Sequence, residues 1–155
     1  MSRGLGDVYK RQIKSRAKLG FAVKDIIDNM PGAFIVYRAD KENDEILLAN
    51  NELLRLTGCK NMDELLAYTG KSFRNLIRRD EQESCQKSIW SQIDGGNVND
   101  YSFFHMRKAD GTYISVLDHG RIVDSVRNGR VFYVMIMDLN ALQRHYGDCL
   151  ELVEK

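Results

Sequence analysis

The most constraining feature of the sequence is a pair of hairpin turns in its second half. Asp110-Gly111 and Asn128-Gly129 separate three runs rich in β-branched and aromatic residues: Tyr101–Lys108, Tyr113–Val123 and Val131–Asp138. Asp-Gly and Asn-Gly favour the left-handed backbone that tight turns between antiparallel strands require. The second half of the chain is therefore predicted to form a three-stranded antiparallel meander.

Two further strands are predicted earlier, over Ala33–Tyr37 and Glu45–Ala49, joined by the polar loop Asp40–Asp44. Ala33–Tyr37 and Val131–Met137 are apolar at nearly every position, which is typical of strands covered on both faces. These two strands are therefore expected to lie centrally in the sheet.

A helical insert separates the two groups of strands. Its predicted pieces are Asn50–Thr57, Met62–Tyr68, Ser72–Ile77 and a longer helix over Asp80–Asp94. Asp80 and Glu83 have the spacing of a capping box at the start of the longer helix. Strands grouped on either side of a helical insert predict an α+β domain on an antiparallel sheet, not a βαβ array.

The N-terminal 30 residues divide into two parts. Residues 1–12 have no helical or strand period and are interpreted as a non-native or disordered tail. Residues 13–30 are predicted to form an amphipathic helix, because their apolar side chains recur at helical spacing. These side chains are Leu19, Val23, Ile26, Ile27 and Met30. The domain core is expected over residues 31–138, beginning at Pro31-Gly32.

Residues 139–155 are predicted to form a C-terminal signalling helix. The 3-4-3-4 spacing of their larger side chains is that of a heptad seam. The seam consists of Leu139, Leu142, Tyr146, Cys149 and Val153. Such a seam suits either the start of a longer linker or an amphipathic helix packed on its own domain.

Composition excludes several classes of protein. The chain has 155 residues and a net charge of +1, which suits one globular domain. Six Lys or Arg residues against Asp7 give residues 1–20 a charge of +5 and the remainder −4, so no basic face for nucleic acid is expected. No run reaches the roughly 18 apolar residues of a membrane span. The odd count of three separated Cys residues favours the reducing cytoplasm over a disulfide framework or zinc site.

Four segments in order resemble a PAS domain, the sensory module common in bacterial diguanylate cyclases and histidine kinases. They are Asp25–Gly32, Leu48–Gly58, Met106–Thr112 and Phe132–Leu139, and the likeness extends over roughly residues 24–140. The chain departs from the family pattern at Arg78–Glu81, where His-Pro-Asp-Asp is common, and at Ser115, where Trp is common. It closes with Asp138-Leu139-Asn140 in place of Asp-x-Thr, and Asn140 is still expected to cap the outgoing helix.

The resemblance implies a five-stranded antiparallel sheet of order 2-1-5-4-3 with the helical insert on one face. It implies a sensory domain, not an enzyme, that binds a small ligand or a partner. The signal would pass through Asp138, Asn140 and the C-terminal helix to an effector absent from this chain, such as a diguanylate cyclase or a kinase. The other sheet face would be covered by residues 13–30 or by a second copy in a homodimer. A ligand-free dimerisation scaffold is the competing hypothesis.

A ligand pocket is expected between the inner face of the sheet and the insert. The residues predicted to line it are Leu76, Ile89, Trp90, Phe104, Met106, Met135 and Met137. Methionine-rich walls adapt to varied ligands, although the same residues also suit plain core packing. Arg121 or His119 would anchor a carboxylate if either side chain faces inward.

The cofactor is not identified by the sequence, and two cofactors are disfavoured. Haem-binding relatives use a His on the long helix, and Asp80–Asp94 has none. Cys85 on that helix is interpreted as a buried structural residue. Covalent flavin chemistry needs a Cys within Lys71–Ile77, where none occurs; non-covalent flavin stacked on Trp90 stays open.

Nucleophilic catalysis is also disfavoured. Cys59 has no neighbouring His to act as a base. Asp118 and His119 are adjacent on a predicted strand, so their side chains should point to opposite faces. Ser115 and His119 share a face but are too far apart to form a hydroxyl–imidazole pair. His105 and His145 have no second metal ligand at matching spacing.

Overall fold

The structure of the protein is a computed structural model that describes residues 19–154, and the side chains of residues 148–154 are outside this description. The chain forms two compact units, one up to Met30 and one from Pro31 onward, which are described separately. The predicted tail over residues 1–12 and the start of the predicted helix, residues 13–18, lie outside the described residues.

In the first unit, helix α2 spans Val23–Asp28. The helix is therefore shorter, in the described range, than the prediction of residues 13–30. Leu19 lies in a turn ahead of it. The side chain of Asn29 donates a hydrogen bond to the carbonyl of Asp25 at 2.7 Å, which satisfies an acceptor at the end of the helix.

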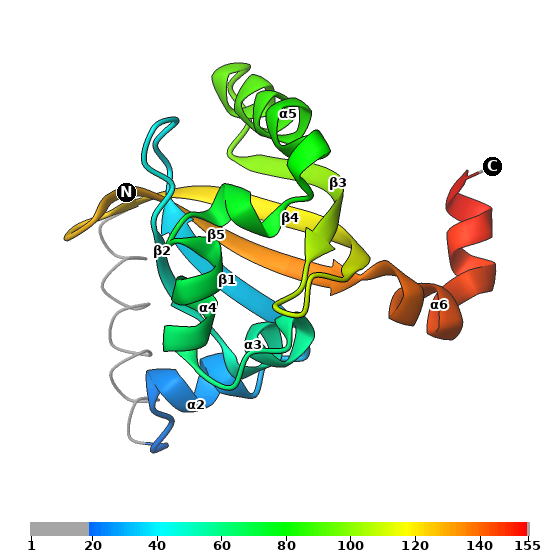
Figure 1. Cartoon of the computed structure of the whole chain (residues 1–155), viewed down its shortest axis with the longest axis horizontal. Helices are drawn as coiled ribbons and strands as arrows, with labels where there is room; N and C mark the ends of the chain where they lie inside the picture. Colours follow the sequence, from blue (N-terminus) through cyan, green and yellow to red (C-terminus); the bar gives the residue numbers. More distant parts are fainter. Residues whose placement is uncertain (1–18, 155) are drawn as a thin grey trace, which may run out of the picture. The chain divides into compact units, whose positions relative to one another are not determined.

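The second unit is built on a five-stranded antiparallel sheet of order β2-β1-β5-β4-β3 (Figure 1), as the resemblance predicted. The strands are β1 Ala33–Arg38, β2 Ile46–Ala49, β3 Asn99–Arg107, β4 Tyr113–Ser125 and β5 Gly129–Asp138. The two most apolar strands, β1 and β5, lie inside the sheet and not at its edges, as predicted. The meander β3-β4-β5 is the hairpin series that the two Gly-containing turns indicated.

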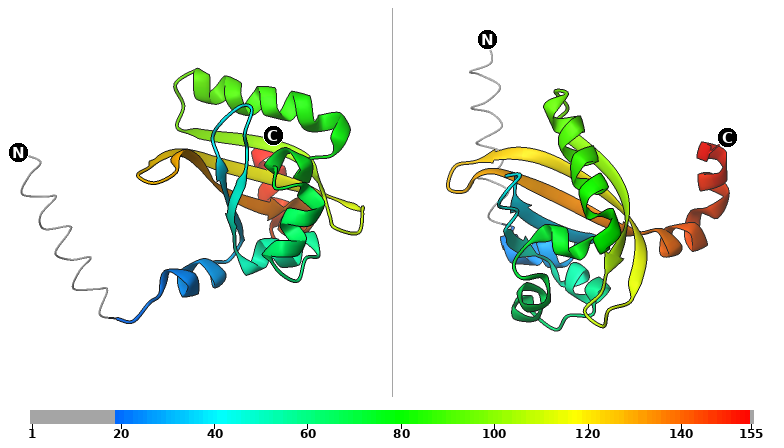
Figure 2. Two further views of the ribbon diagram at one scale, coloured as in Figure 1. Left: turned by 60° about the vertical axis from the view of Figure 1, so that its left-hand side comes forward. Right: turned by 45° about the horizontal axis from the view of Figure 1, so that its top comes forward.

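Short helices and one longer helix connect β2 to β3. They are α3 Asn51–Thr57, α4 Met62–Thr69, the 3₁₀ turns η1 Phe73–Leu76 and η2 Arg79–Glu81, and α5 Gln82–Asp94. Buried residues of α3, α4, η1 and α5 share one hydrophobic cluster with β1, β3, β4 and β5. The insert thus covers one face of the sheet, with α5 lying along β3 (Figure 2).

Asn50 fixes the start of the insert against β1. Its Oδ1 accepts hydrogen bonds from the backbone N–H of Leu53 at 3.0 Å and of Phe34 at 2.9 Å, and its Nδ2 donates to the carbonyl of Gly32 at 3.0 Å. The side chain is therefore both the N-cap of α3 and a clamp on the first strand. At the other end of α3, Gly58 adopts φ 80°, a left-handed cap that glycine takes without strain.

The predicted capping box at the start of the long helix is wrong. The helix begins at Gln82, after the 3₁₀ turn, and its N-cap Glu81 makes no side-chain cap bond. Asp80 instead accepts a hydrogen bond from Arg78 Nε at 2.7 Å. The ion pair with a side chain two residues away competes successfully with the backbone N–H groups of the helix.

The C-terminal helix α6, Leu139–Glu154, differs from the predicted continuous seam. Tyr146 has non-helical angles (φ −133°, ψ 23°), so the helix is kinked there, and the Tyr146 side chain is 58% exposed. The flexible Gly147 follows directly. The seam positions Cys149 and Val153 lie among the residues whose side chains are not described. None of the described helices has the length and apolarity needed to cross a membrane.

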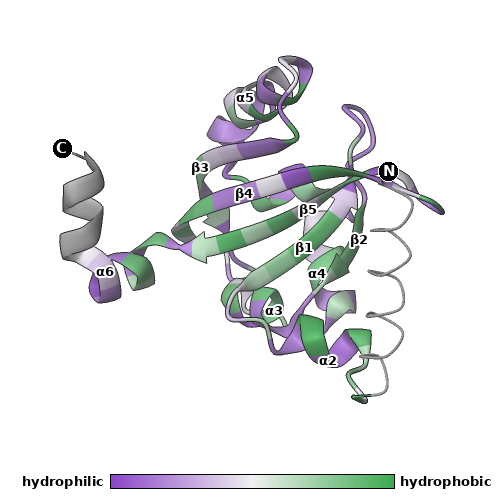
Figure 3. Cartoon of the chain, turned by 180° about the vertical axis from the view of Figure 1, so that it is seen from behind, coloured by the Kyte–Doolittle hydropathy of each residue, from purple (hydrophilic) through white to green (hydrophobic). Residues whose placement is uncertain are grey.

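The outer face of the sheet is the face opposite the insert, and Figure 3 looks onto it with apolar colouring along β1 and β5. Aromatic side chains stand exposed there: Phe103 is 70%, Tyr101 54% and Tyr133 45% exposed. Tyr101 stacks on His119 with ring centroids 4.4 Å apart. This face therefore remains rich in accessible apolar surface.

Candidate functional site

The candidate site is the interior between α5 and the inner face of the sheet. The buried positions of β3 are Asp100, Ser102, Phe104 and Met106, which alternate with more exposed ones. On β5 the buried positions facing this cluster are Phe132, Val134 and Ile136. The α5 face that meets them carries Cys85, Ile89 and Trp90.

Five of the seven residues predicted to line a pocket lie in this interior: Leu76, Ile89, Trp90, Phe104 and Met106. Met135 and Met137 do not, because they alternate with Val134 and Ile136 and so lie on the outer face of the sheet. The prediction correctly divided the alternating residues of β5 into two faces, but it assigned the wrong face to the interior beneath the helices. Both sets are apolar, so the strand sequence itself does not distinguish them.

Two carboxyl groups lie in the same interior, and the sequence prediction did not include them. Asp100 on β3 and Asp118 on β4 are each 1% exposed. No hydrogen-bond partner reaches any of their four carboxyl oxygens within the described part of the chain. Strand alternation would have located Asp100. It is an even number of residues, four, from Phe104, which was predicted to point inward, so both side chains lie on the same face.

The strand register sets the spacing of the two carboxyl groups. Asp118 is directly opposite Ser102, and Asp100 is directly opposite Gly120. Asp100 and Asp118 are therefore diagonal neighbours on one face, with Cα atoms about 7–8 Å apart. A Cβ at position 120 would lie 2.5 Å from Asp100 Oδ1, so the glycine leaves the space that the carboxyl group fills.

Burial changes the protonation of these groups. It raises the pKa of Asp100 to about 6. Burial and, secondarily, the charge of Asp100 raise the pKa of Asp118 well above its usual value. The physical cause is the loss of solvation for the ionised form, which at Asp100 the residue's own backbone offsets only in part. Both groups thus hold protons to higher pH than exposed carboxyls do.

Neutral polar groups surround the pair. Cys85 Sγ lies 3.1 Å from Ser102 Oγ, which links α5 to β3. Burial raises the pKa of the Cys85 thiol to about 11, so it stays protonated, consistent with the structural role predicted for it. Burial, with the charges of Asp118 and Asp100, also raises the pKa of Tyr37 well above its usual value.

A surface pocket of about 310 Å³ opens where α5 meets β3. Its lining includes Cys85, Ser88, Tyr101 and Ser102, and neither Asp100 nor Asp118 lines it. Because Ser102 is directly opposite Asp118 in the strand pairing, the pocket lies next to the buried carboxyl group. This geometry suits a small ligand that enters between the helix and the edge strand.

The other polar candidates lie elsewhere. His119, Arg121 and Ser115 alternate with the buried positions of β4, so the condition that Arg121 or His119 faces inward to anchor a carboxylate is not met. His105 contacts Glu81 Oε1 through Nδ1 at 2.7 Å and ties β3 to the start of α5. Asp118 and His119 point to opposite faces, as predicted.

The output end of the domain is the junction of β5 and α6. Asp138 Oδ1 accepts hydrogen bonds from the N–H of Asn140 at 2.9 Å and of Ala141 at 3.3 Å. Asp138 therefore caps α6, and not Asn140, whose side chain is exposed. A second pocket of about 530 Å³ lies at this junction, lined by residues that include Arg55, Asp138 and Tyr146.

Comparison with known proteins identifies the architecture. A sequence model of the PAS fold matches residues 46–137. The structure resembles the PAS domain of an HTR-like protein from Haloarcula marismortui, with TM-score 0.58, 20% identity and coverage of 86% of this chain and 98% of that one.

Two further PAS domains are similar at the level of the fold. One belongs to a LuxR-family transcriptional regulator from Burkholderia thailandensis and was solved in complex with ethanol (TM-score 0.59, 20% identity, 77% and 99% coverage). The other belongs to a two-component sensor histidine kinase (TM-score 0.59, 17% identity, 80% and 98% coverage). No curated protein matches the sequence. Since the family model spans more than half of the chain and the strand order agrees, the protein belongs to the PAS-fold family of sensory and regulatory domains.

Proposed function

We propose that this PAS domain is a sensor that binds a small ligand between α5 and β3 and passes the change through Asp138 to α6 and an attached effector. The observation that carries the proposal is the polar interior itself, where two carboxyl groups lie buried without partners beside a pocket. A similar PAS domain was solved in complex with ethanol, which supports the binding of a small molecule by a domain of this fold.

Transmission is supported by the continuity of β5 with α6. Residues of β5 pair with β4 up to Asp138, which lies opposite Val116, two residues before Asp118. The same Asp138 holds the first N–H groups of α6. A shift of β4 that accompanies ligand binding would therefore act directly on the cap of α6. An effector such as a diguanylate cyclase or a kinase would follow α6.

Protein purified from a bacterial expression host should carry a non-covalently bound small molecule, measured as the difference between its native and denatured masses. Ser102→Leu should abolish that mass difference, because the larger side chain fills the interior end of the pocket. Ser115→Leu is the matched control on the outer face of β4 and should retain it. Removal of the ligand should also change amide hydrogen exchange over residues 139–146.

The proposal would be contradicted if the purified protein had no bound molecule, or if the two serine variants behaved alike. An unliganded dimer would favour the second candidate function, a dimerisation scaffold. The exposed aromatic side chains on the outer sheet face are the observation that favours this alternative.

If the scaffold hypothesis holds, Phe103→Asp should convert a dimer into a monomer in light-scattering measurements at micromolar concentration. A charge at this exposed position would oppose burial of the face in an interface. Val126→Asp, in the exposed turn between β4 and β5, is the control and should leave the mass unchanged. Equal masses for wild type and Phe103→Asp would exclude this face as the dimer contact.

A further inference from the structure

The buried carboxyl pair is the feature of the interior that ordinary core packing explains least. A carboxylate transferred from water to a protein interior loses several kcal/mol of solvation unless a cation or hydrogen-bond donors replace the water. Among the described residues, none places a hydrogen-bond partner on the carboxyl oxygens of Asp100 or Asp118, and only the backbone of Asp100 itself offsets part of this loss at Asp100. If these positions only filled the core, apolar residues at both would make the fold more stable.

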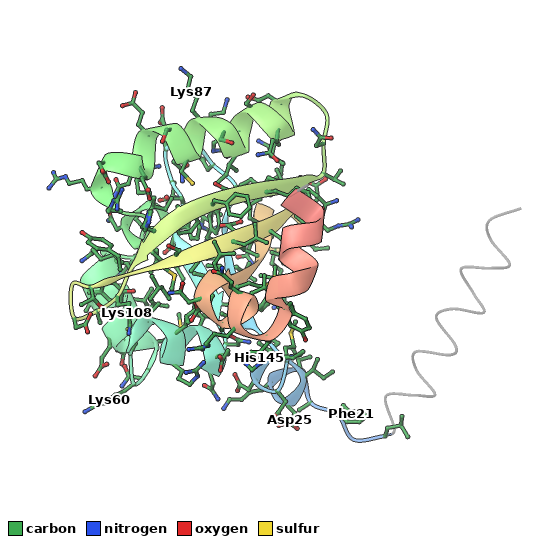
Figure 4. The ribbon with its side chains drawn as sticks, turned by 90° about the vertical axis from the view of Figure 1, so that its right-hand side faces the viewer. Phe21, Asp25, Lys60, Lys87, Lys108 and His145 are labelled. Carbon is green, nitrogen blue, oxygen red and sulfur yellow. The ribbon has the colours of Figure 1, made fainter. Side chains whose placement is uncertain are left out.

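The titratable groups around the pair are neutral or acidic. Tyr37 of β1 and Cys85 of α5 interact electrostatically with both carboxyl groups, and they also interact with Asp44 of the β1–β2 loop and with Glu81, respectively. None of them is a cation. The Lys87 side chain of α5 points away from the sheet (Figure 4). The interior therefore has acceptors for a positive charge, and within residues 19–147 no protein group is recorded that supplies one.

We propose that this interior site binds a small organic cation, such as a primary ammonium or a guanidinium, whose N–H groups donate to Asp118 and Asp100. The inference rests on the proposed ligand-binding function and adds the chemical class of the ligand. The diagonal spacing of the two residues brings both carboxyl groups within reach of one cationic group. The hydroxyl of Ser102 supplies a further acceptor beside Asp118.

An organic cation fits this site better than a metal ion. No group of three or more His, Cys, Asp or Glu side chains in the described part of the chain is arranged to hold a metal. The pocket of about 310 Å³ at the α5–β3 edge has room for a small amine and would require partial opening between helix and strand to admit it.

The test is a matched series of probes with one apolar body and a cationic, neutral or anionic end group: 2-phenylethylamine, 2-phenylethanol and 3-phenylpropanoate, with pentylamine, 1-pentanol and pentanoate as the aliphatic series. Protein freed of any co-purified molecule is titrated with each probe at pH 7, and the melting temperature and the heat of binding are measured. At least one amine should raise the melting temperature and bind at least about tenfold more tightly than its alcohol, as expected when a hydrogen bond to a charged group is gained.

Asp118→Asn should weaken amine binding by at least about tenfold, because one charged acceptor becomes neutral. Asp124→Asn, at an exposed position of the same strand, is the control and should leave binding unchanged. Below pH 6, binding should also release protons, since the cation ionises carboxyl groups that are otherwise protonated. Calorimetry in two buffers of different ionisation enthalpy measures this release.

Two outcomes would overturn the inference. If an alcohol or a carboxylate binds as well as its amine, the ligand class is wrong, while the proposed interior binding site stands. If no probe binds, the inference fails. The proposed function fails as well only if the purified protein also lacks a bound molecule, so the two failures are distinguishable.

Discussion

Replacing Asp118 with asparagine should raise the free energy of unfolding, and the gain should grow with pH. Asparagine has nearly the same shape but is never ionised, so it avoids the loss of solvation that the buried carboxylate suffers. Burial raises the pKa of Asp118 in the folded protein, whereas the unfolded chain has the ordinary value near 4. Between these two values the folded state holds more protons than the unfolded state, so the stability of the wild type falls as pH rises.

The neighbouring Asp100, whose folded pKa is about 6, gives the scale of such an effect. A shift of that size corresponds to roughly 3 kcal/mol once the pH exceeds both the folded and the unfolded pKa. The pKa of Asp118 is raised in the same direction by the same cause, burial. The variant and the wild type should therefore differ little at pH 4, and the variant should become increasingly the more stable of the two as the pH rises to 8.

Urea unfolding of both proteins at several pH values measures this difference. Four carboxyl groups with lowered pKa values, Glu52, Asp80, Glu81 and Asp110, make the opposite contribution, which is lost as pH falls through the acid range. They are present in both proteins, so their contribution cancels in the comparison. Asp124→Asn is the surface control. A stability difference independent of pH would contradict the assignment of a buried, unpartnered carboxylate at position 118.

Replacing Phe132 with alanine should lower the free energy of unfolding by about 3–5 kcal/mol, as for other large aromatic residues removed from a core. Phe132 on β5 is fully buried. Its ring lies 5.1 Å from that of Tyr37 and 5.5 Å from that of Trp90, measured between centroids. The substitution would therefore remove contacts that join β1, β5 and α5.

Tyr133→Ala provides the matched control, one residue away on the same strand. The Tyr133 side chain is 45% exposed on the outer face and meets only the edge of the Phe34 ring, at 5.9 Å, among the ring contacts of the described residues. We expect its loss to cost about 1 kcal/mol or less. Similar losses for the two variants, measured by urea unfolding, would mean that the face assignment of β5 is wrong.

Much of the fold was predictable because it depends on local signals. The turns at Asp110-Gly111 and Asn128-Gly129 specify hairpins whatever surrounds them, and Gly58 ends α3 by its own backbone preference. The prediction failed where a second interaction competed with the one that the local sequence pattern indicated. Asp80 had the spacing of a cap but pairs with Arg78, and the cap of α6 is Asp138 and not Asn140.

The candidate site was predictable only in part. Period-two alternation correctly separated Asp118 from His119 and grouped Met135 with Met137. It did not say which group faces the helices, because strands covered on both sides are apolar on both sides. The same alternation would also place Asp100 with Phe104 and Met106. The prediction did not include Asp100, because an acidic residue in a core position runs against the usual rule that buried residues are apolar.

The sequence by itself determined the strands, their turns, the helical insert and the order in which they occur, because turn chemistry and apolar periodicity act over a few residues. Only the tertiary structure decided that Asp100 and Asp118 share one buried face beneath α5. Their proximity depends on the register of β3 against β4 and on the packing of a helix across them, which are long-range contacts. The buried pair that supports the proposed ligand site is therefore a property of the folded sheet and not of either strand alone.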